Sequence, residues 1–289
     1  MDTPSDFSEI RYEKPSARVA RIVLARPETR NAQGLAMLYE VNRAFDMAMH
    51  DDEVRVVIVA ADGPHFSSGH HLGDRSNPGA HGPAVLGFGG YDLPGAEGYM
   101  AKEQEIYLGF CWRWRNLPKP TIVQVQGKAI AGALMLIWPC DIVIASEDAE
   151  FSDPVVAFGV NGHEFFVHAW EVGHRKAKEM LFAGEAISAA EGKALGMVNH
   201  VVPRDKLDSF TLEMAEKIAQ RPTIGLKLAK LSVNQSLDAQ GMWTALQSAF
   251  ALHQLGHTHN RLMHGDIVDP AGIDVIRNQA KAKRGTGTN

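Results

Sequence analysis

Two glycine-containing segments have the residue types needed to stabilise a negatively charged oxygen. Residues 66–72 read FSSGHHL and residues 127–134 read GKAIAGAL. Each is typical of a turn at the end of a strand, and such a turn can direct a backbone N–H at a bound group. Two N–H donors that converge on one carbonyl oxygen form an oxyanion hole, in which each donor typically contributes about 2.7–4 kcal/mol. The two segments therefore predict a site that polarises a carbonyl group.

The elements that must position these turns alternate between strands and helices. Apolar and β-branched runs predict strands, and apolar residues at helical spacing predict an amphipathic helix between the first two of them. The predicted strands are 18–24, 54–59, 121–125 and 142–145, and the predicted helices include 34–50, 101–116, 133–138 and 189–195. This order indicates an α/β fold.

Two other stretches differ from that alternation. Residues 74–98 are rich in glycine and proline without a sustained period, which predicts a long loop with a functional role. From residue 207 onward the pattern is helical throughout. We therefore expect a core over residues 1–205 and a helical region over residues 206–289.

Composition limits the class of partner. The chain has 289 residues, 45% of them hydrophobic, and a formal net charge of −5. A protein that binds nucleic acids or anionic membranes needs a basic surface, and a net negative charge argues against one. Neither is therefore expected as a partner. Two cysteines and an acidic, polar N-terminus predict free thiols in a cytoplasmic protein without a secretory signal or membrane span.

Several ordered motifs carry a resemblance to a known family. They are RP at 26–27, NA at 31–32, the FSSGHHL segment, QGKAIAG at 126–132, AEFSDP at 149–154, and GMV at 196–198. In this order and spacing, they resemble the crotonase superfamily of enoyl-CoA hydratases and isomerases, over about residues 17–260. The resemblance implies a spiral of ββα units, a C-terminal helical trimerisation region, and assembly into homotrimers or homohexamers.

The resemblance also implies a binding site for an acyl-CoA substrate. The family's oxyanion donors match the backbone N–H groups of His70 and Gly132. Arg26 and Arg30 match residues that reach the phosphates or ribose of coenzyme A, and the backbone near Ser68 and His70 matches the lining of the adenine site. Coenzyme A is then part of the substrate, and no separate cofactor is expected.

The match breaks at the two catalytic glutamates of the family's hydratases. Met135 and Val155 occupy those positions. Each general acid or base typically accelerates a reaction about 10²–10⁴-fold. Because both glutamates are replaced here, efficient hydration by the two-glutamate route is not expected. Two residues of a nearby loop, His163 and Glu164, are candidates for a replacement base, since either side chain can transfer protons.

No metal is expected from the sequence. His253 and His257 have the i, i+4 spacing of zinc ligands on one helix face, and His259 lies close by. No motif sets a third ligand, so structural roles in the helix or in subunit contacts are favoured for these histidines.

Three functions remain open at this point. Isomerisation, or another reaction of an acyl-CoA enolate that needs one base, fits the residues better than hydration. Decarboxylation of a malonyl-type acyl-CoA would produce the enolate without a base in its first step, and apolar Met135 and Val155 would suit that chemistry. A binding protein that kept the thioester site but lost the chemistry is the third.

Overall fold

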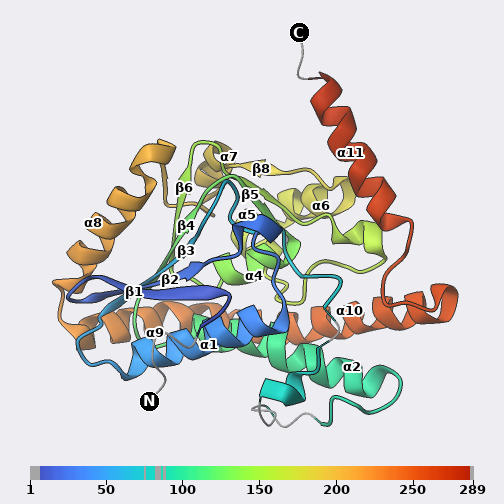
Figure 1. Ribbon diagram of the computed structural model, residues 1–289, viewed down its shortest axis with the longest axis horizontal. Coiled ribbons are helices and arrows are strands. Elements are labelled where there is room, and N and C mark those ends of the chain that lie inside the picture. Colours follow the sequence, from blue (N-terminus) through green and yellow to red (C-terminus); the bar gives the residue numbers. More distant parts are fainter. Residues whose placement is uncertain (1–6, 75, 82–85, 87–88, 287–289) are drawn as a thin grey trace.

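The computed structural model describes residues 7–74, 76–81, 86 and 89–286 (Figure 1). Its strands are β1 (Ile10–Ser16), β2 (Val19–Leu24), β3 (Val56–Ala61), β4 (Thr121–Val125), β5 (Lys128–Ile130), β6 (Ile142–Ser146), β7 (Glu150–Ser152), β8 (Ile187–Ser188) and β9 (His200–Val202). Its longer helices are α1 (Leu35–His50), α2 (Ala96–Glu103), α3 (Phe110–Arg115), α4 (Leu134–Ile137), α5 (His168–Val172), α6 (His174–Ala183), α7 (Ala189–Leu195), α8 (Leu207–Ala219), α9 (Thr223–Ala239), α10 (Met242–His264) and α11 (Gly272–Thr286). Short turns of helix are η2 (Pro27–Thr29), η3 (Pro78–His81), η5 (Ala131–Ala133), η6 (Val155–Phe158) and η7 (Arg204–Lys206), and η4 (Gln104–Gly109) has π-helical bonding.

The main sheet has six strands in the order β1-β2-β3-β4-β6-β9. β1 runs antiparallel to β2, and the remaining neighbours are parallel. All six residues of β3 are buried, as expected for a strand covered on both faces. The α/β prediction is confirmed, and the predicted strand boundaries agree to within two residues.

A second, smaller sheet carries the predicted oxyanion segments. Its order is β5-β7-β8, and an isolated bridge between Ser67 and Ala129 joins the first segment to β5. The N–H of Ser67 donates to Lys128 O at 3.2 Å, and the N–H of Ile130 donates to Ser67 O at 3.1 Å. This ladder fixes the two segments side by side.

Helices cover both faces of the main sheet. Leu207, Ala215 and Ala219 of α8 pack on one face, against apolar side chains of β2, β3, β4 and β6. The other face belongs to the larger core, which includes buried side chains of α1, α3, α4 and α10. In Figure 1, α8 lies at the left of the sheet, whereas α9 and α10 run along the bottom beside α1 and α2.

Local sequence signals set several helix ends. The N–H of Glu191 donates to Ser188 Oγ at 3.2 Å, and Gly196 ends α7 with φ of 88°. A serine N-cap and a left-handed glycine after the last turn are the residue types that favour these two ends, and they bound the helix predicted at 189–195. The helix predicted at 101–116 instead begins at Ala96 and changes to π-helical bonding at Gln104–Gly109. Hydrophobic periodicity does not distinguish this bonding from an ordinary helix, and π segments are frequent at functional sites.

The predicted loop at 74–98 is described only in part. Residues 75, 82–85, 87 and 88 lie outside the described residues, and η3 and the first turn of α2 occupy part of the remainder. Its functional role stays a prediction. Elsewhere, no described helix is both long and apolar enough to cross a bilayer. Cys111 and Cys140 are free thiols, as expected.

Glu171 in α5 makes the stability of the fold depend on pH. Burial raises the pKa of this carboxyl to about 7, and the charge of Arg115 only partly offsets the effect. A carboxyl with a raised pKa stays protonated to a higher pH in the folded state than in the unfolded state. Its contribution to stability is therefore full below pH 4.5 and is lost as the pH rises through about 7. Each pKa unit corresponds to about 1.4 kcal/mol, and partial exposure of Glu171 reduces the effect.

We therefore expect Glu171→Gln to flatten the decline in unfolding free energy between pH 5 and 8, with a gain of at most about 3 kcal/mol at pH 8. Urea unfolding of both proteins across this pH range measures the difference. An unchanged pH dependence in the variant would contradict the raised pKa.

Candidate active site

A cavity of about 580 Å³ opens between the two predicted oxyanion segments, the helix formed by α2 and η4, and α10. The polar residues on its wall are Ser68, His70, His71, Asp74, Tyr99, Lys102, Glu103, Tyr107, His163, Glu164, His253, His257, Arg261 and Asp266. Apolar residues complete the wall, among them Ile130, Val155, Phe158 and Val160. Five residues that the sequence predicted for the site, including Gly132, therefore line one cavity.

The two predicted donor residues lie against each other. A side-chain carbon added at Gly69 would lie 2.6 Å from Ile130 O and 3.2 Å from Gly132 N, and Gly69 has φ of 87°. A side-chain carbon added at Gly132 would lie 2.6 Å from His70 Nδ1. The close approach of the two turns therefore requires glycine at both positions.

The backbone N–H groups of this turn have different partners. Gly69 N–H donates to Ser67 Oγ at 3.1 Å, and His71 N–H donates to Gln33 O at 2.9 Å. Over the described part of the chain, no protein acceptor is recorded for the His70 N–H between them. Gly132 lies in the first turn of η5, where N–H groups have no acceptor within the helix.

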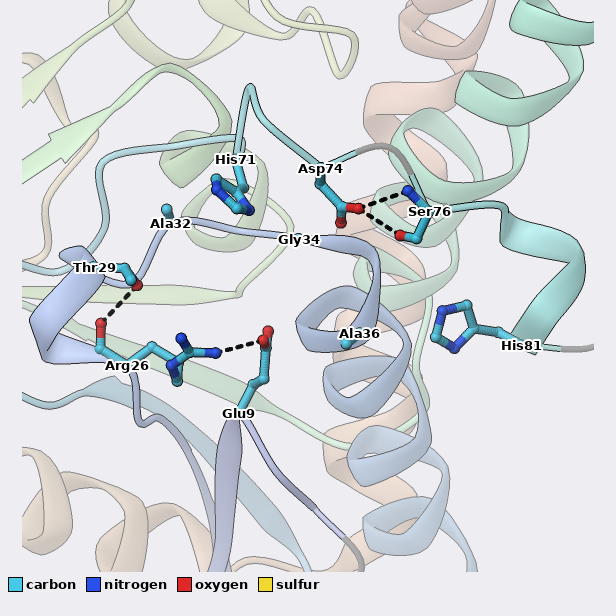
Figure 2. Close-up of a pocket in the computed structure, with 10 residues that line it drawn as sticks. All are labelled: Glu9, Arg26, Thr29, Ala32, Gly34, Ala36, His71, Asp74, Ser76 and His81. Carbon is cyan, nitrogen blue, oxygen red and sulfur yellow. Dashed lines mark hydrogen bonds and ion pairs between the residues drawn. The ribbon is translucent and has the colours of Figure 1, made fainter.

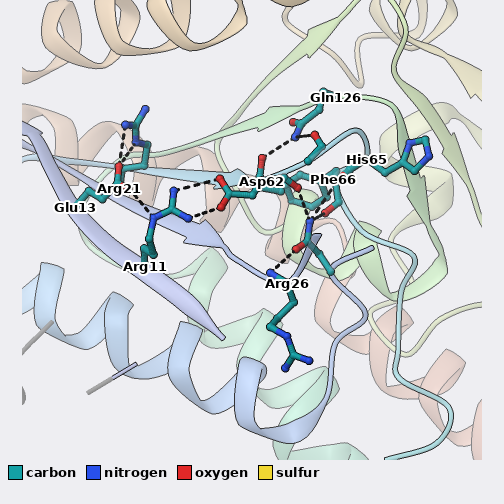
Figure 3. A network of polar contacts seen from close by, with 11 residues as sticks. Arg11, Glu13, Arg21, Arg26, Asp62, His65, Phe66 and Gln126 are labelled. Carbon is teal, nitrogen blue, oxygen red and sulfur yellow. Dashed lines mark hydrogen bonds and ion pairs between the residues drawn. The ribbon is translucent and has the colours of Figure 1, made fainter. Parts of the chain in front are cut away.

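The buried side chain of Asn31 forms hydrogen bonds with the backbone at the start of the first predicted oxyanion segment. The side-chain amide of Asn31 donates to Asp62 O at 2.9 Å and to Phe66 O at 3.0 Å, and its oxygen accepts from Arg26 N at 2.9 Å. Figure 3 shows the surrounding network, in which Asp62 also meets Arg11. The NA motif at 31–32 thus has a structural basis, because Asn31 fixes the backbone that leads into residues 66–72.

Five ionisable side chains, four of them buried and His70 partly buried, form a row along the cavity wall. His70 Nε2 lies 3.3 Å from Glu164 Oε2, and Glu164 Oε1 lies 3.5 Å from His253 Nε2. Glu103 follows, with one oxygen 3.8 Å from His253 Nε2 and the other 3.4 Å from His257 Nε2. The row therefore alternates histidine and carboxylate, beginning at the predicted oxyanion turn.

The row perturbs the protonation of its members. Burial would raise the pKa of Glu164, but the neighbouring His70 and His253 outweigh it and hold that pKa below its usual value. Burial would lower the pKa of His257, and contact with Glu103 raises it instead. The His70 ring also stacks on Tyr107, with ring centres 4.1 Å apart, which fixes its orientation.

His163 and Glu164 are adjacent in sequence, but their side chains have different neighbours. The centre of the His163 ring lies 5.0 Å from that of Trp138 and 4.6 Å from that of His168, and the backbone N–H of His163 donates to Asp153 at 2.9 Å. Burial and the nearby His168 lower the pKa of His163 to about 3. Asp153 is fully buried and also accepts from His168 at 2.8 Å. The His163 ring is therefore neutral at physiological pH.

The predicted coenzyme A residues are divided between two places. Ser68 lines the main cavity, and its N–H donates to Arg30 O at 2.9 Å, which places the exposed Arg30 next to it. Arg26 lines a second cavity of about 450 Å³ that shares His71 and Asp74 with the first (Figure 2).

Arg26 is already paired with carboxylates in this second cavity. Its Nη1 lies 2.6 Å from Glu9, and its Nε contacts Glu28. Figure 2 shows the Arg26 and Glu9 side chains directed toward each other. A phosphate at Arg26 would therefore compete with two glutamates.

The two positions at which the family's hydratases were expected to carry glutamates have different surroundings. Val155 lies on the cavity wall, whereas Met135 is buried in the main core within α4. The buried carboxylates on the cavity wall are those of Glu103 and Glu164.

The sequence did not predict that α2 and η4 contribute side chains to the cavity. Glu103 and Tyr107 enter the cavity from α2 and η4, and nothing in their spacing marks them as functional. The only signal is a glutamate on a helix face that also carries buried apolar residues such as Ile106 and Phe110. His253 and His257 were noted for their spacing, but their carboxylate neighbours are distant in sequence.

Known proteins share both the sequence and the fold. A family model described as enoyl-CoA hydratase/isomerase matches residues 14–264. "Putative enoyl-CoA hydratase EchA13" of Mycobacterium tuberculosis is 45% identical over 263 residues, covering 89% of this chain and 83% of that protein. The human "Enoyl-CoA hydratase domain-containing protein 3, mitochondrial" is 34% identical, covering 72% and 64% of the two chains.

Solved structures agree with these matches. A "probable ENOYL-COA Hydratase" from Mycobacterium smegmatis has a TM-score of 0.81 and 44% identity, covering 90% of this chain and 99% of that chain. An "enoyl-CoA hydratase/isomerase" from Xanthobacter autotrophicus has a TM-score of 0.75 and 33% identity, covering 90% and 94%. The expected crotonase-type fold, with its helical C-terminal region, is therefore confirmed, and the chain belongs to the enoyl-CoA hydratase/isomerase family.

Proposed function

We propose that the protein binds an acyl-CoA thioester in the 580 Å³ cavity and moves a proton on its acyl group through an enolate-like intermediate. The N–H groups of His70 and Gly132 would donate to the thioester oxygen, and Glu164 would exchange the proton. The observation that carries this proposal is the buried Glu164 carboxylate, 3.3 Å from the side chain of His70. A proton acceptor beside the polarised carbonyl is the arrangement that enolate chemistry needs.

Glu164 is preferred to His163 as the base because of the position of its side chain. Its carboxylate belongs to the row of ionisable groups on the cavity wall, whereas the His163 ring packs against Trp138 and His168.

A single base favours isomerisation, or another atypical reaction, over hydration by two glutamates. Val155, at one of the two glutamate positions, lines the cavity and offers no acid or base. Purified protein should shift the double bond of an enoyl-CoA faster than it hydrates crotonyl-CoA, as measured by chromatography of the products. Hydration of crotonyl-CoA as the faster reaction would contradict this preference.

The other two functions receive less support. Glu103 and Glu164 would repel the free carboxylate of a malonyl-type substrate, so the cavity is poorly suited to decarboxylation. A protein that only binds acyl-CoA has no need for the four buried ionisable side chains of this row, which are costly to desolvate. Absence of turnover with every enoyl-CoA offered, together with tight binding, would favour the binding protein.

The coenzyme A moiety would extend from the main cavity past Ser68 and Arg30. Arg30 is exposed beside Ser68 and suits a phosphate, whereas Arg26 would first have to leave Glu9 and Glu28. Arg30→Ala should therefore weaken the binding of coenzyme A esters more than Arg26→Ala does. Coenzyme A would enter as part of the substrate, without a separate organic cofactor.

Assembly into a homotrimer or homohexamer is also part of this proposal. Exposed apolar side chains recur along α9 and α10, at Ile224, Leu228, Leu231, Leu252, Leu255 and Leu262. Such stripes are typical of surfaces that associate. Light scattering should give the mass of three or six chains. Leu255→Asp should lower that mass, and Leu195→Asp, on α7, should not. A monomeric wild-type protein would contradict the proposal.

A further inference from the structure

We propose that Glu103, His253 and His257 bind a divalent transition-metal ion such as Zn²⁺, with Glu164 facing the remaining coordination position. Two histidines and one carboxylate are an established ligand set for such ions. The ligand atoms of these four buried residues all lie within 4.8 Å of one another. This site shares Glu164 with the acyl-CoA proposal, but metal binding can be tested separately from turnover.

The tautomers of the two histidines prepare them for metal binding. His253 Nδ1 donates to Gly162 O at 2.8 Å, and His257 Nδ1 donates to Ile267 O at 2.6 Å. These bonds leave Nε2 of each ring to face the carboxylates. Metal-binding histidines almost always donate their other ring N–H to an oxygen in this way.

The Nε2 atoms have no hydrogen-bond partner. Both are buried in side chains that are only 4% and 8% exposed, and neither forms a hydrogen bond within the described part of the chain. A buried polar atom without a partner is costly, and a ligand aimed at it would remove the cost.

The spacing of the ligand atoms fits a metal better than direct hydrogen bonds. His257 Nε2 lies 3.4 Å from Glu103, and His253 Nε2 lies 3.8 Å from Glu103 and 3.5 Å from Glu164. Hydrogen bonds to nitrogen are about 2.7–3.2 Å long. Ligands bound to tetrahedral zinc at about 2.0–2.1 Å lie about 3.3–3.4 Å from each other. Small movements would therefore place an ion between these atoms.

The two carboxylates have different positions relative to the histidines. Glu103 contacts both histidines, one with each oxygen, and is the central ligand. Of the two proposed histidine ligands, Glu164 contacts His253 alone, and its other carboxylate oxygen faces His70. Glu164 therefore lies on the side of the ion that faces the predicted oxyanion turn.

Metal binding by the full-length protein tests the proposal without any activity assay. After treatment with a chelator and dialysis, the protein should bind one equivalent of Zn²⁺ by titration calorimetry and show a higher melting temperature with the ion. Co²⁺ should give the visible absorption of a four- or five-coordinate site. Failure of the wild-type protein to bind either ion would overturn the proposal, whatever the result of the acyl-CoA assays.

Variants locate the ion. His257→Gln and Glu103→Gln should each weaken Zn²⁺ binding by at least about a hundredfold. His259→Gln changes an exposed histidine of the same helix and should bind normally. The buried group of Asp153, His163 and His168 is the competing location. Loss of binding in His168→Gln, with normal binding in His257→Gln and Glu103→Gln, would place the ion there and overturn the proposal.

Discussion

Replacing Glu164 by glutamine is expected to lower turnover of an acyl-CoA substrate by about 10²–10⁴, with little change in the dissociation constant of the substrate. The amide has the size of the carboxylate and can still contact His70, but it cannot accept a proton. Stopped-flow or steady-state assays give the turnover number, and calorimetry with the same thioester gives the affinity.

Two further variants serve as a control and as a test of the competing base. Glu147→Gln replaces an exposed glutamate outside the cavity and should match the wild type. His163→Asn should retain most of the turnover, because the proposed base is its neighbour. Normal turnover in Glu164→Gln, together with a large loss in His163→Asn, would assign the proton transfer to His163 instead.

Adding one methyl group at Gly132 is the second change with a large expected effect. The new carbon would lie 2.6 Å from the His70 ring. That ring cannot move aside easily, because it stacks on Tyr107 and contacts Glu164. Gly132→Ala should therefore separate the two proposed donors and lower kcat/KM by about 10²–10³, the effect of losing one oxyanion donor.

A second glycine provides the matched control. Gly225 lies in α9, and a side-chain carbon there would meet no atom within 4 Å. Gly225→Ala should preserve activity and raise the unfolding free energy slightly, since alanine favours a helix by about 1 kcal/mol over glycine. Normal kinetics in Gly132→Ala, with the variant folded as judged by circular dichroism, would contradict the proposed role of the 132 turn.

The sequence predicted the elements that local patterns determine. The alternation of β2 and β3, the periodicity of α1 and the capping box at Ser188 are all short-range signals, and each matches the structure. The two glycine segments also lie against each other in the structure, since their close approach limits the residue type strongly, whereas their role as oxyanion donors stays a prediction. Ordered motifs then supplied the long-range arrangement through the family resemblance.

The row of histidines and carboxylates could not be predicted in the same way. Glu103 lies in α2, Glu164 in the loop before α5, and His253 in α10, so only the fold brings them together. The spacing of His253 and His257 is that of metal ligands, but no sequence motif supplies a third ligand near them. The pairing of Arg26 with Glu9 and Glu28 also depends on tertiary contacts.

The position of the thioester oxygen tests the account most directly. A crystal structure of the protein with an unreactive acyl-CoA thioether or thioester analogue should place the carbonyl oxygen about 2.7–3.1 Å from both His70 N and Gly132 N. The acyl carbons should then lie next to Glu164. A carbonyl oxygen bound away from these two amides, or amides that point in different directions around the ligand, would contradict the proposed mechanism.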